Sequence, residues 1–190
     1  VLPIYNEQEN IKALIEELRL YMKGQAYKII AVNDGSSDDS SKILKTLCAN
    51  DLEVIGTKIN MNVGAVFSSG IGRALETAQN DDIFIIMESD RTSDIKVVGL
   101  MVEKIRQEGQ DIVIASRYQR GGSYKNFPAL RRVFSFGASF LMRYIFPIQN
   151  VRDYTVFFRA YRVAVIRHAI QYFGMSGLIQ SKGFVANAEL

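Results

Sequence analysis

Acidic residues follow two apolar segments of the chain that have the composition of β-strands. Residues 27–32 lead into Asn33 and Asp34, and residues 83–87 lead into Glu88 and Asp90. In an open α/β sheet, ligands bind in the crevice beyond the carboxyl ends of the strands. The sequence therefore predicts a ligand site that both acidic turns face.

Glu88 and Asp90 are two residues apart, so an extended backbone places their side chains on the same side. Two convergent carboxylates repel each other unless a cation lies between them. Mg²⁺ and Mn²⁺ take oxygen ligands and keep positions for waters and substrate phosphates. We therefore predict a nucleotide ligand, with Mg²⁺ or Mn²⁺ bound to its diphosphate.

A second interpretation is that these acidic turns only begin the helices that follow them, because Asp and Ser are favoured at helix starts. This interpretation is favoured for Ser37, Asp38, Ser93 and Asp94. A ligand role is favoured for Asp34 and Asp90, because each follows a buried strand.

Regular alternation of strands and helices is predicted around these turns. Apolar runs predict strands over 27–32, 52–56, 83–87 and 111–115, and helical spacing predicts helices over 7–22, 38–49, 64–78 and 95–108. Such alternation is typical of a single α/β domain with a mostly parallel central sheet and helices on both faces.

The segment after the last predicted strand differs in composition. Residues 117–128 are rich in Gly, Tyr and Lys, which predicts a lid-like loop. Residues 129–146 predict a helix with apolar side chains on nearly every side, flanked by Arg131, Arg132 and Arg143. Such a helix is either deeply buried or partly embedded in a membrane interface.

Composition limits the class of protein. The chain has 190 residues, 48% of them hydrophobic, which suffices for one domain with a sizeable core. Its single Cys48, expected on the apolar side of a helix, excludes an internal disulfide, and with a single His168 we find neither a zinc site nor a Ser-His-Asp triad. No apolar run reaches the roughly 18 residues that would cross a bilayer.

Charge is unevenly distributed along the chain. Residues 1–116 contain 12 Lys and Arg against 18 Asp and Glu, whereas residues 117–167 contain 10 Lys and Arg against one Asp. A basic half suits further phosphates or an anionic membrane surface, although a solvated basic face is the alternative. No recognised nucleic-acid-binding motif accompanies these basic residues, so we expect no nucleic-acid partner.

Six short segments match a known family in order and spacing, almost from end to end. They are Val1-Leu2-Pro3-Ile4-Tyr5-Asn6-Glu7, Asn33-Asp34-Gly35-Ser36, Asn62-Val63-Gly64, Glu88-Ser89-Asp90, Ala115-Ser116-Arg117-Tyr118 with Gly121-Gly122, and Val151-Arg152-Asp153-Tyr154-Thr155 through Phe158-Arg159-Ala160-Tyr161-Arg162. The chain thus resembles family 2 glycosyltransferases of the GT-A fold, and most closely the dolichol-phosphate mannose synthase-like, polyprenyl-phosphate glycosyltransferase branch. The resemblance implies one Rossmann-like GT-A catalytic domain over residues 1–190. We expect it to be a fragment that lacks the start of its first strand and a C-terminal region.

The resemblance also implies a donor site for a nucleotide-diphosphate sugar, either a UDP- or a GDP-sugar. In that site Pro3, Tyr5, Glu7 and Asp34 would hold the base and ribose. Gly64 would allow the backbone to approach the donor closely.

The expected catalytic residues are Asp90, Asp153, Arg117 and Arg131. Glu88 and Asp90 would hold Mg²⁺ or Mn²⁺, and Arg117 with Arg131 or Arg132 would bind donor or acceptor phosphates, for which a guanidinium is well shaped. The implied reaction is an inverting displacement at the anomeric carbon. A polyprenyl phosphate acceptor is already ionised, whereas a sugar hydroxyl would need a general base, for which Asp153 is the candidate.

Several residues depart from the family pattern. Glu88 stands where the family usually has Asp, Asn33 replaces an Asp, and Val156-Phe157 replaces a small Ser-Gly pair. These changes keep two alternatives open: transfer to a saccharide hydroxyl in cell-wall, polysaccharide or lipopolysaccharide assembly, and an inactive module that binds nucleotide sugars. For the leading interpretation we expect the full-length protein at the cytoplasmic face of a membrane.

Overall fold

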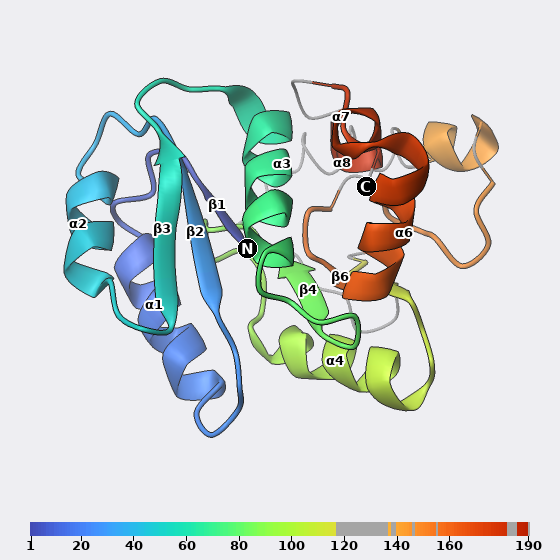
Figure 1. Ribbon diagram of the computed structural model, residues 1–190, viewed down its shortest axis with the longest axis horizontal. Helices are drawn as coiled ribbons and strands as arrows, with labels where there is room; N and C mark the ends of the chain where they lie inside the picture. Colours follow the sequence, from blue (N-terminus) through green and yellow to red (C-terminus); the bar gives the residue numbers. More distant parts are fainter. Residues whose placement is uncertain (117–136, 138–139, 146, 155, 182–185, 190) are drawn as a thin grey trace.

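The computed structural model describes residues 1–116, 137, 140–145, 147–154, 156–181 and 186–189 (Figure 1). The strands are β1 (Leu2–Ile4), β2 (Ile29–Asp34), β3 (Leu52–Thr57), β4 (Ile83–Ile86), β5 (Ile112–Ile114) and β6 (Arg159–Arg162). The helices with defined bounds are α1 (Ile11–Tyr21), α2 (Ser40–Leu47), α3 (Asn62–Leu75), α4 (Lys96–Gln107), α6 (Val163–Phe173), α7 (Met175–Leu178) and α8 (Ala186–Glu189). The predicted strands and helices up to residue 116 are confirmed within a few residues at each end.

The first half of the sheet is parallel, in the order β1-β2-β3. Its middle strand β2 begins with four buried residues in succession, Ile29 to Val32. A continuous buried run of this kind is typical of a strand covered on both faces. Asn33 and Asp34 end that strand, so the fold places them at its carboxyl edge.

The second half has the order β4-β6-β5, and β6 runs antiparallel to both of its neighbours. The two halves join at Val1, whose backbone nitrogen donates to the Ile85 oxygen at 2.6 Å and whose oxygen accepts from the Met87 nitrogen at 3.2 Å. This is the bonding pattern of a parallel bridge. The mostly parallel sheet is therefore confirmed, with β6 as its antiparallel member.

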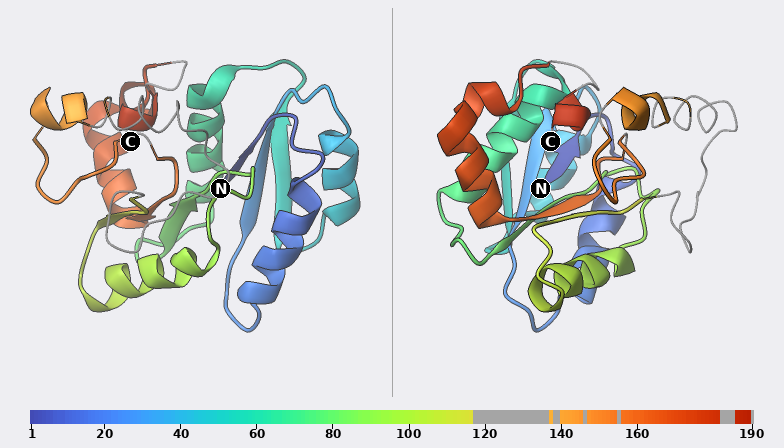
Figure 2. Two further views of the ribbon diagram at one scale, coloured as in Figure 1. Left: turned by 180° about the vertical axis from the view of Figure 1, so that it is seen from behind. Right: turned by 90° about the vertical axis from the view of Figure 1, so that its right-hand side faces the viewer.

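Helices cover both faces of these strands, as the views in Figures 1 and 2 show. One core joins α1, α2 and α4 to the sheet through buried residues that include Ile15, Leu44 and Met101. The other joins α3 and α6 through Phe67 and Ile166. Alternate residues of β4 serve the two cores, since a strand points successive side chains to opposite faces.

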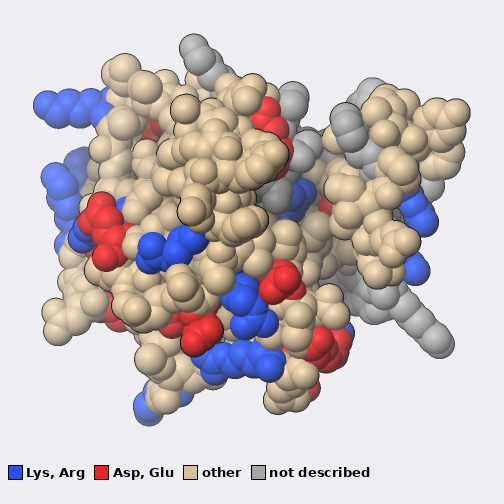
Figure 3. Space-filling view, turned by 45° about the vertical axis from the view of Figure 1, so that its right-hand side comes forward, with Lys and Arg blue, Asp and Glu red and all other residues tan. Residues whose placement is uncertain are grey.

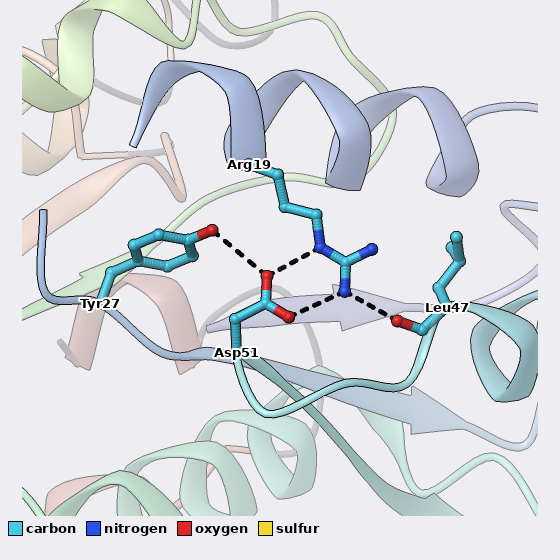
Figure 4. A network of polar contacts seen from close by, with 4 residues as sticks. All are labelled: Arg19, Tyr27, Leu47 and Asp51. Atoms are coloured by element: carbon cyan, nitrogen blue, oxygen red, sulfur yellow. Dashed lines mark hydrogen bonds and ion pairs between the residues drawn. The ribbon is translucent and has the colours of Figure 1, made fainter. Parts of the chain in front are cut away.

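A polar network fixes the amino-terminal edge of the first sheet, opposite the acidic turns (Figure 4). Arg19 of α1 binds the Asp51 carboxylate with two nitrogens, at 2.7 and 2.9 Å, and donates to the Leu47 oxygen at 2.8 Å. The Tyr27 hydroxyl donates to the same carboxylate at 3.2 Å. Bidentate guanidinium–carboxylate contacts are stronger than ordinary neutral hydrogen bonds. This network therefore ties α1 to the start of β3.

Two predictions need correction or completion. Cys48 lies just beyond the end of α2 and is exposed, so its expected place on an apolar helix face is wrong.

In the predicted helix 129–146, residues 137 and 140–145 are helical, and Phe140, Leu141, Tyr144 and Ile145 are exposed. Deep burial is thus wrong for these four side chains. Among the residues that the structure describes, no helix is both long and apolar enough to cross a membrane.

Candidate active site

The carboxyl ends of β1, β2 and β4 lie next to one another, because β1 pairs with β2 and Val1 bonds to β4. Each strand leads into a polar turn: residues 5–8 after β1, residues 35–38 after β2 and residues 88–91 after β4. Parallel strands bring these three turns to one edge. Residues that lie far apart in the chain therefore form one candidate site.

Direct hydrogen bonds join the turns after β1 and β2. The Asn6 side-chain oxygen accepts from the Ser37 backbone nitrogen at 2.8 Å, and the Asn6 backbone nitrogen donates to the Ser36 hydroxyl at 3.1 Å. Asn6 adopts a positive φ of 56°, which Asn tolerates better than most residues. The amide side chain and the backbone conformation together set the geometry of this junction.

Asp34 lies at the centre of this edge and is only 5% exposed. Its Oδ1 accepts a hydrogen bond from the Met61 backbone nitrogen at 2.6 Å. Gly35 follows with φ 66°, and a Cβ there would lie 2.5 Å from the Ile59 carbonyl carbon. The turn after β2 thus packs closely against residues 59–61, and glycine is required for that approach.

The β1 residues that were predicted to bind a nucleotide lie at the same edge. The Pro3 oxygen accepts from the Ser89 hydroxyl at 2.8 Å, so β1 is bonded to the turn after β4. Tyr5 is 51% exposed, which leaves its ring accessible to a ligand. Burial raises the pKa of Glu7, a hydrogen bond from Asn10 opposes this, and the charges of Asp90 and Asp38 raise the pKa further.

Glu88 is partly buried and turned toward the protein. Its Oε1 accepts from the Phe157 backbone nitrogen at 3.1 Å, and its Oε2 accepts from the Ser93 hydroxyl at 3.0 Å. Burial raises the pKa of Glu88, these hydrogen bonds lower it, and the nearby charge of Asp90 raises it. The Glu88 carboxylate therefore links the turn after β4 to the distant segment around Phe157, a contact that the sequence alone does not predict.

Asp90, in contrast, is exposed. Its Oδ1 accepts from the backbone nitrogen and the hydroxyl of Thr92, at 3.0 and 2.7 Å. The next residue, Arg91, has φ 57° and pairs with Glu17, so its guanidinium is directed toward α1. The turn therefore presents Asp90 to solvent at the edge of the sheet.

The donor set allows a test of whether a divalent cation fits. Within the described part of the chain, no three or more His, Cys, Asp or Glu residues are grouped so as to hold a metal ion. Asp90 nevertheless raises the pKa of both Glu88 and Glu7, so three carboxylates share one negative field. A hard cation that shares its coordination between carboxylate, waters and diphosphate oxygens fits such a field.

Asp153 is fully buried. Arg159 of β6 is also buried, and it donates to the Val156 oxygen and the Tyr154 oxygen, each at 3.0 Å. Its guanidinium therefore holds the backbone that follows Asp153. Arg117, Arg131 and Arg132 lie outside the described residues, so their phosphate roles remain predictions.

Gly64 makes a close backbone approach of a different kind from the one predicted. A Cβ at this position would overlap the carbonyl oxygen of Ser181, a residue more than a hundred positions later in the chain. The glycine is therefore required by the packing of α3 against the C-terminal segment. Its contact with a donor remains a prediction.

Two of the four helix-start residues bond to the first residue of the helix that follows, although the N-cap positions are Asp39 and Ile95, neither of which makes a side-chain cap hydrogen bond. Asp38 accepts from the nitrogen of Ser40, the first residue of α2, and Asp94 accepts from that of Lys96, the first residue of α4, each at 3.0 Å. Ser37 instead donates to Asn6 at 3.3 Å. Ser93 donates to Glu88, as described above.

Several site residues escaped the sequence analysis as individual contributors. They are Asn6, Ser36, Ser89 and Arg159. A signal existed for the first three, since each is a small polar residue within two positions of an acidic residue that was predicted to bind the ligand. Arg159 gave none beyond its place in a family segment, because its contacts depend on where the fold puts the Tyr154 and Val156 oxygens.

Three described arginines of the basic segment, residues 117–167, make contacts within the fold. Arg162 binds Asp111 at 3.2 Å, and Arg167 donates to the Leu75 and Ala78 oxygens near the end of α3. With Arg159 buried, three of these arginines serve the fold. On the face in Figure 3, Lys and Arg side chains lie among Asp and Glu side chains over its left and lower parts.

Comparison with solved structures supports the architecture. The fold matches crystal structures of glucosyl-3-phosphoglycerate synthase from Mycobacterium tuberculosis, one in complex with Mn²⁺, UDP and glucosyl-3-phosphoglycerate. The TM-score is 0.61 at 17% sequence identity, and the match covers 93% of this chain and 66% of that chain. At this identity the match speaks for the fold alone.

Sequence relatives point to one kind of transferase. The chain is 30% identical over 168 residues to a dolichol-phosphate mannosyltransferase of Pyrococcus furiosus, covering 87% of this chain and 46% of the relative. It is 25% identical to a polyprenol monophosphomannose synthase of Mycolicibacterium smegmatis, covering all of this chain and 69% of the relative. It is 31% identical to an undecaprenyl-phosphate 4-deoxy-4-formamido-L-arabinose transferase of Yersinia pestis, covering 90% of this chain and 49% of the relative.

The chain spans about half the length of the Pyrococcus and Yersinia relatives. A family model, described as glycosyl transferase family 2, matches residues 1–170. That span contains β1 to β6 and all three polar turns. The chain therefore belongs to glycosyl transferase family 2.

Proposed function

We propose that this domain transfers a sugar from a nucleotide-diphosphate sugar to a polyprenyl phosphate. The observation that carries the proposal is the meeting of Asp34, Asp90 and Tyr5 at one sheet edge, in a chain whose relatives are named as polyprenyl-phosphate sugar transferases. The edge offers aromatic surface, backbone groups and carboxylates within one set of adjoining turns. These are the groups that a base, a ribose and a metal-bound diphosphate require.

The donor would lie across the turns after β1 and β2. Asp34, buried and fixed by Met61, has little rotational freedom, so a hydrogen bond from a base or ribose would cost little ordering entropy. Tyr5 offers a ring face, and Pro3 and Glu7 lie on the same strand and turn. We assign these four residues to nucleoside binding, with either UDP or GDP as the nucleotide.

Asp90 would hold Mg²⁺ or Mn²⁺ beside the diphosphate, whereas Glu88, the other carboxylate of the turn, accepts hydrogen bonds from Phe157 and Ser93. When bound, the cation would neutralise charge that develops on the departing nucleoside diphosphate. Asp90 is suited to this role because it is exposed and already perturbs the two neighbouring carboxylates. Arg117 and Arg131 are proposed to bind donor or acceptor phosphates.

The burial of Asp153 favours a phosphate acceptor over a sugar hydroxyl. A general base must come within hydrogen-bond reach of the proton that it removes, and Asp153 is fully buried. A phosphate oxygen is already ionised near neutral pH and can attack the anomeric carbon without a base. We therefore assign Asp153 to shaping the acceptor side.

Access to a lipid acceptor requires proximity to a membrane. Exposed Phe140, Leu141, Tyr144 and Ile145 lie on one short helical segment together with Arg143. Apolar side chains beside a cation suit the interface of an anionic bilayer. We propose that this segment contacts the cytoplasmic face of the membrane in the full-length protein.

The test is transfer from a panel of UDP- and GDP-sugars to a short-chain polyprenyl phosphate, with Mn²⁺, with Mg²⁺ and with chelator. Full-length protein is used, with Asp90→Asn as the matched variant. We expect metal-dependent transfer to the lipid that falls by about a hundredfold in Asp90→Asn. Transfer to a saccharide but not to the lipid would establish the hydroxyl-acceptor alternative. Donor binding without any transfer would identify an inactive module, and no binding would refute the donor assignment.

A further inference from the structure

The contact between Glu88 and Phe157 joins two positions at which the chain departs from its family pattern. Glu88 replaces the usual Asp, and Phe157 belongs to the Val-Phe pair that replaces Ser-Gly. The structure brings the Glu88 Oε1 to within 3.1 Å of the Phe157 backbone nitrogen, across 69 positions of sequence. The longer acidic side chain is what reaches this backbone group.

Phe157 is held from a second direction by its ring. The rings of Phe157 and Phe67 meet edge to face, with centroids 5.4 Å apart, and Phe67 is 1% exposed in the middle of α3. Such pairs add about 0.5–1.5 kcal/mol beyond simple burial. Backbone and ring together therefore fix Phe157 between the β4 turn and α3.

The backbone before Phe157 is held from the β6 side. Arg159 donates to the Tyr154 and Val156 oxygens, and both residues are buried. Glu88 thus accepts from the Phe157 nitrogen, and Arg159 donates to the Tyr154 and Val156 oxygens just before it. The buried Asp153, assigned above to the acceptor side, directly precedes Tyr154 in the chain.

We propose that Glu88 is a positioning residue that holds residues 156–158 against the turn after β4, and that Asp90 alone supplies the carboxylate for the metal. Both oxygens of Glu88 already accept protein hydrogen bonds, from Phe157 and Ser93, whereas Asp90 is exposed and accepts from Thr92 through Oδ1 alone. This inference rests on the proposed function, because it divides the two carboxylates between the donor and acceptor sides of that site.

Two substitutions of Glu88 separate the roles. Glu88→Gln keeps the reach, since its amide oxygen can accept from Phe157 and its nitrogen can donate to the Ser93 hydroxyl. Glu88→Asp keeps the charge but shortens the side chain by one methylene, so it cannot reach both partners from the same backbone position. A metal ligand requires the charge, whereas a positioning residue requires the reach.

We expect Glu88→Gln to keep the Mn²⁺ activation constant within about threefold of the parent protein, and to lower kcat/KM for the lipid acceptor much less than Glu88→Asp does. We expect Glu88→Asp to lower kcat/KM for the lipid acceptor by about tenfold or more, with the donor KM little changed. Asp90→Asn is the matched control and should raise the Mn²⁺ constant. The opposite order, with Glu88→Asp active and Glu88→Gln impaired, would make Glu88 a metal ligand and overturn the proposal. Equal effects of the two variants would also overturn it.

A second readout needs no substrate or metal. Amide hydrogen exchange at Phe157 should accelerate in Glu88→Asp and stay slow in Glu88→Gln and Asp90→Asn, in protein whose thermal unfolding is otherwise normal. Unchanged exchange in Glu88→Asp would refute the positioning role. Because this measurement is independent of turnover, it still decides the role of Glu88 if the proposed donor or acceptor is wrong.

Discussion

Asp34 Oδ1 accepts a 2.6 Å hydrogen bond from the backbone nitrogen of Met61, which joins the carboxyl end of β2 to the start of α3. The carboxylate that is proposed to bind a nucleoside therefore also holds the wall beside it. Removing the acceptor and removing the charge should have different consequences. The first should affect folding and binding together, whereas the second should affect binding alone.

Asp34→Ala leaves the Met61 N–H without its partner and should cost about 1–3 kcal/mol of unfolding free energy. Asp34→Asn retains a carbonyl oxygen at the same place and should cost less than about 1 kcal/mol. Both should weaken nucleotide-sugar binding by about tenfold. Urea unfolding and calorimetric titration measure the two effects. If Asp34→Asn binds the nucleotide sugar normally, the negative charge of Asp34 does not contribute to binding.

Asp90→Asn should weaken metal-dependent donor binding without destabilising the fold. Asp90 raises the pKa of Glu88 and Glu7 by repulsion, so neutralising it relieves unfavourable charge in the folded state. We expect thermal stability without metal to be unchanged or slightly higher, and the stabilisation produced by Mn²⁺ with UDP or GDP to shrink. Thermal unfolding with and without Mn²⁺ tests this. An undiminished Mn²⁺ effect would exclude Asp90 as the ligand.

Gly35→Ala should be strongly destabilising, because a Cβ would meet the Ile59 backbone at 2.5 Å and φ is 66°. Backbone strain and overlap together predict a loss of about 2–4 kcal/mol. Gly109→Ala is the matched control, since Gly109 has φ 68° but a Cβ added there would have nothing within 4 Å. Its cost should be about 1 kcal/mol. Equal losses in urea unfolding would show that conformation alone, and not close packing, requires Gly35.

Stability should depend on pH through Asp51. Its hydrogen bonds with Arg19 lower the pKa of Asp51 in the folded state. A depressed pKa contributes stability that is present above the unfolded value and is lost as the pH falls toward the folded one. The difference between parent protein and Asp51→Asn should therefore be largest near neutral pH, about 1–2 kcal/mol, and shrink below about pH 4.

Urea unfolding at several pH values measures this difference. Glu108→Gln is the control, because the Lys104–Glu108 pair is exposed and should contribute less than about 0.5 kcal/mol at any pH. If the difference in unfolding free energy for Asp51→Asn instead stays constant from pH 7 to acid, that result would contradict the claim that the Asp51 charge stabilises the fold by pairing with Arg19.

Local pattern predicted the part of the fold that depends on near neighbours. An apolar run predicted the strand that ends at Asp34, and helical spacing of apolar side chains predicted the helix that carries Ile11, Leu14, Ile15 and Leu18. The structure confirms both elements. Because each acid follows a parallel strand directly, the sequence also indicated that Asp34, Glu88 and Asp90 share one edge. Family membership followed from the order of short segments, and residues 1–170 match the family model.

Tertiary structure decided how the residues of that edge divide their contacts. The sequence grouped Glu88 with Asp90 by spacing, but the fold turns Glu88 toward Phe157 and leaves Asp90 facing solvent. It also places β6 antiparallel between β4 and β5, although Arg159 to Arg162 carries no apolar run that would predict a strand. Contacts between residues far apart in the chain, such as Glu88 with Phe157 and Gly64 with Ser181, arise in the same way. Side-chain periodicity reports only which face of an element is apolar, whereas the partner that each polar group meets depends on how distant elements pack.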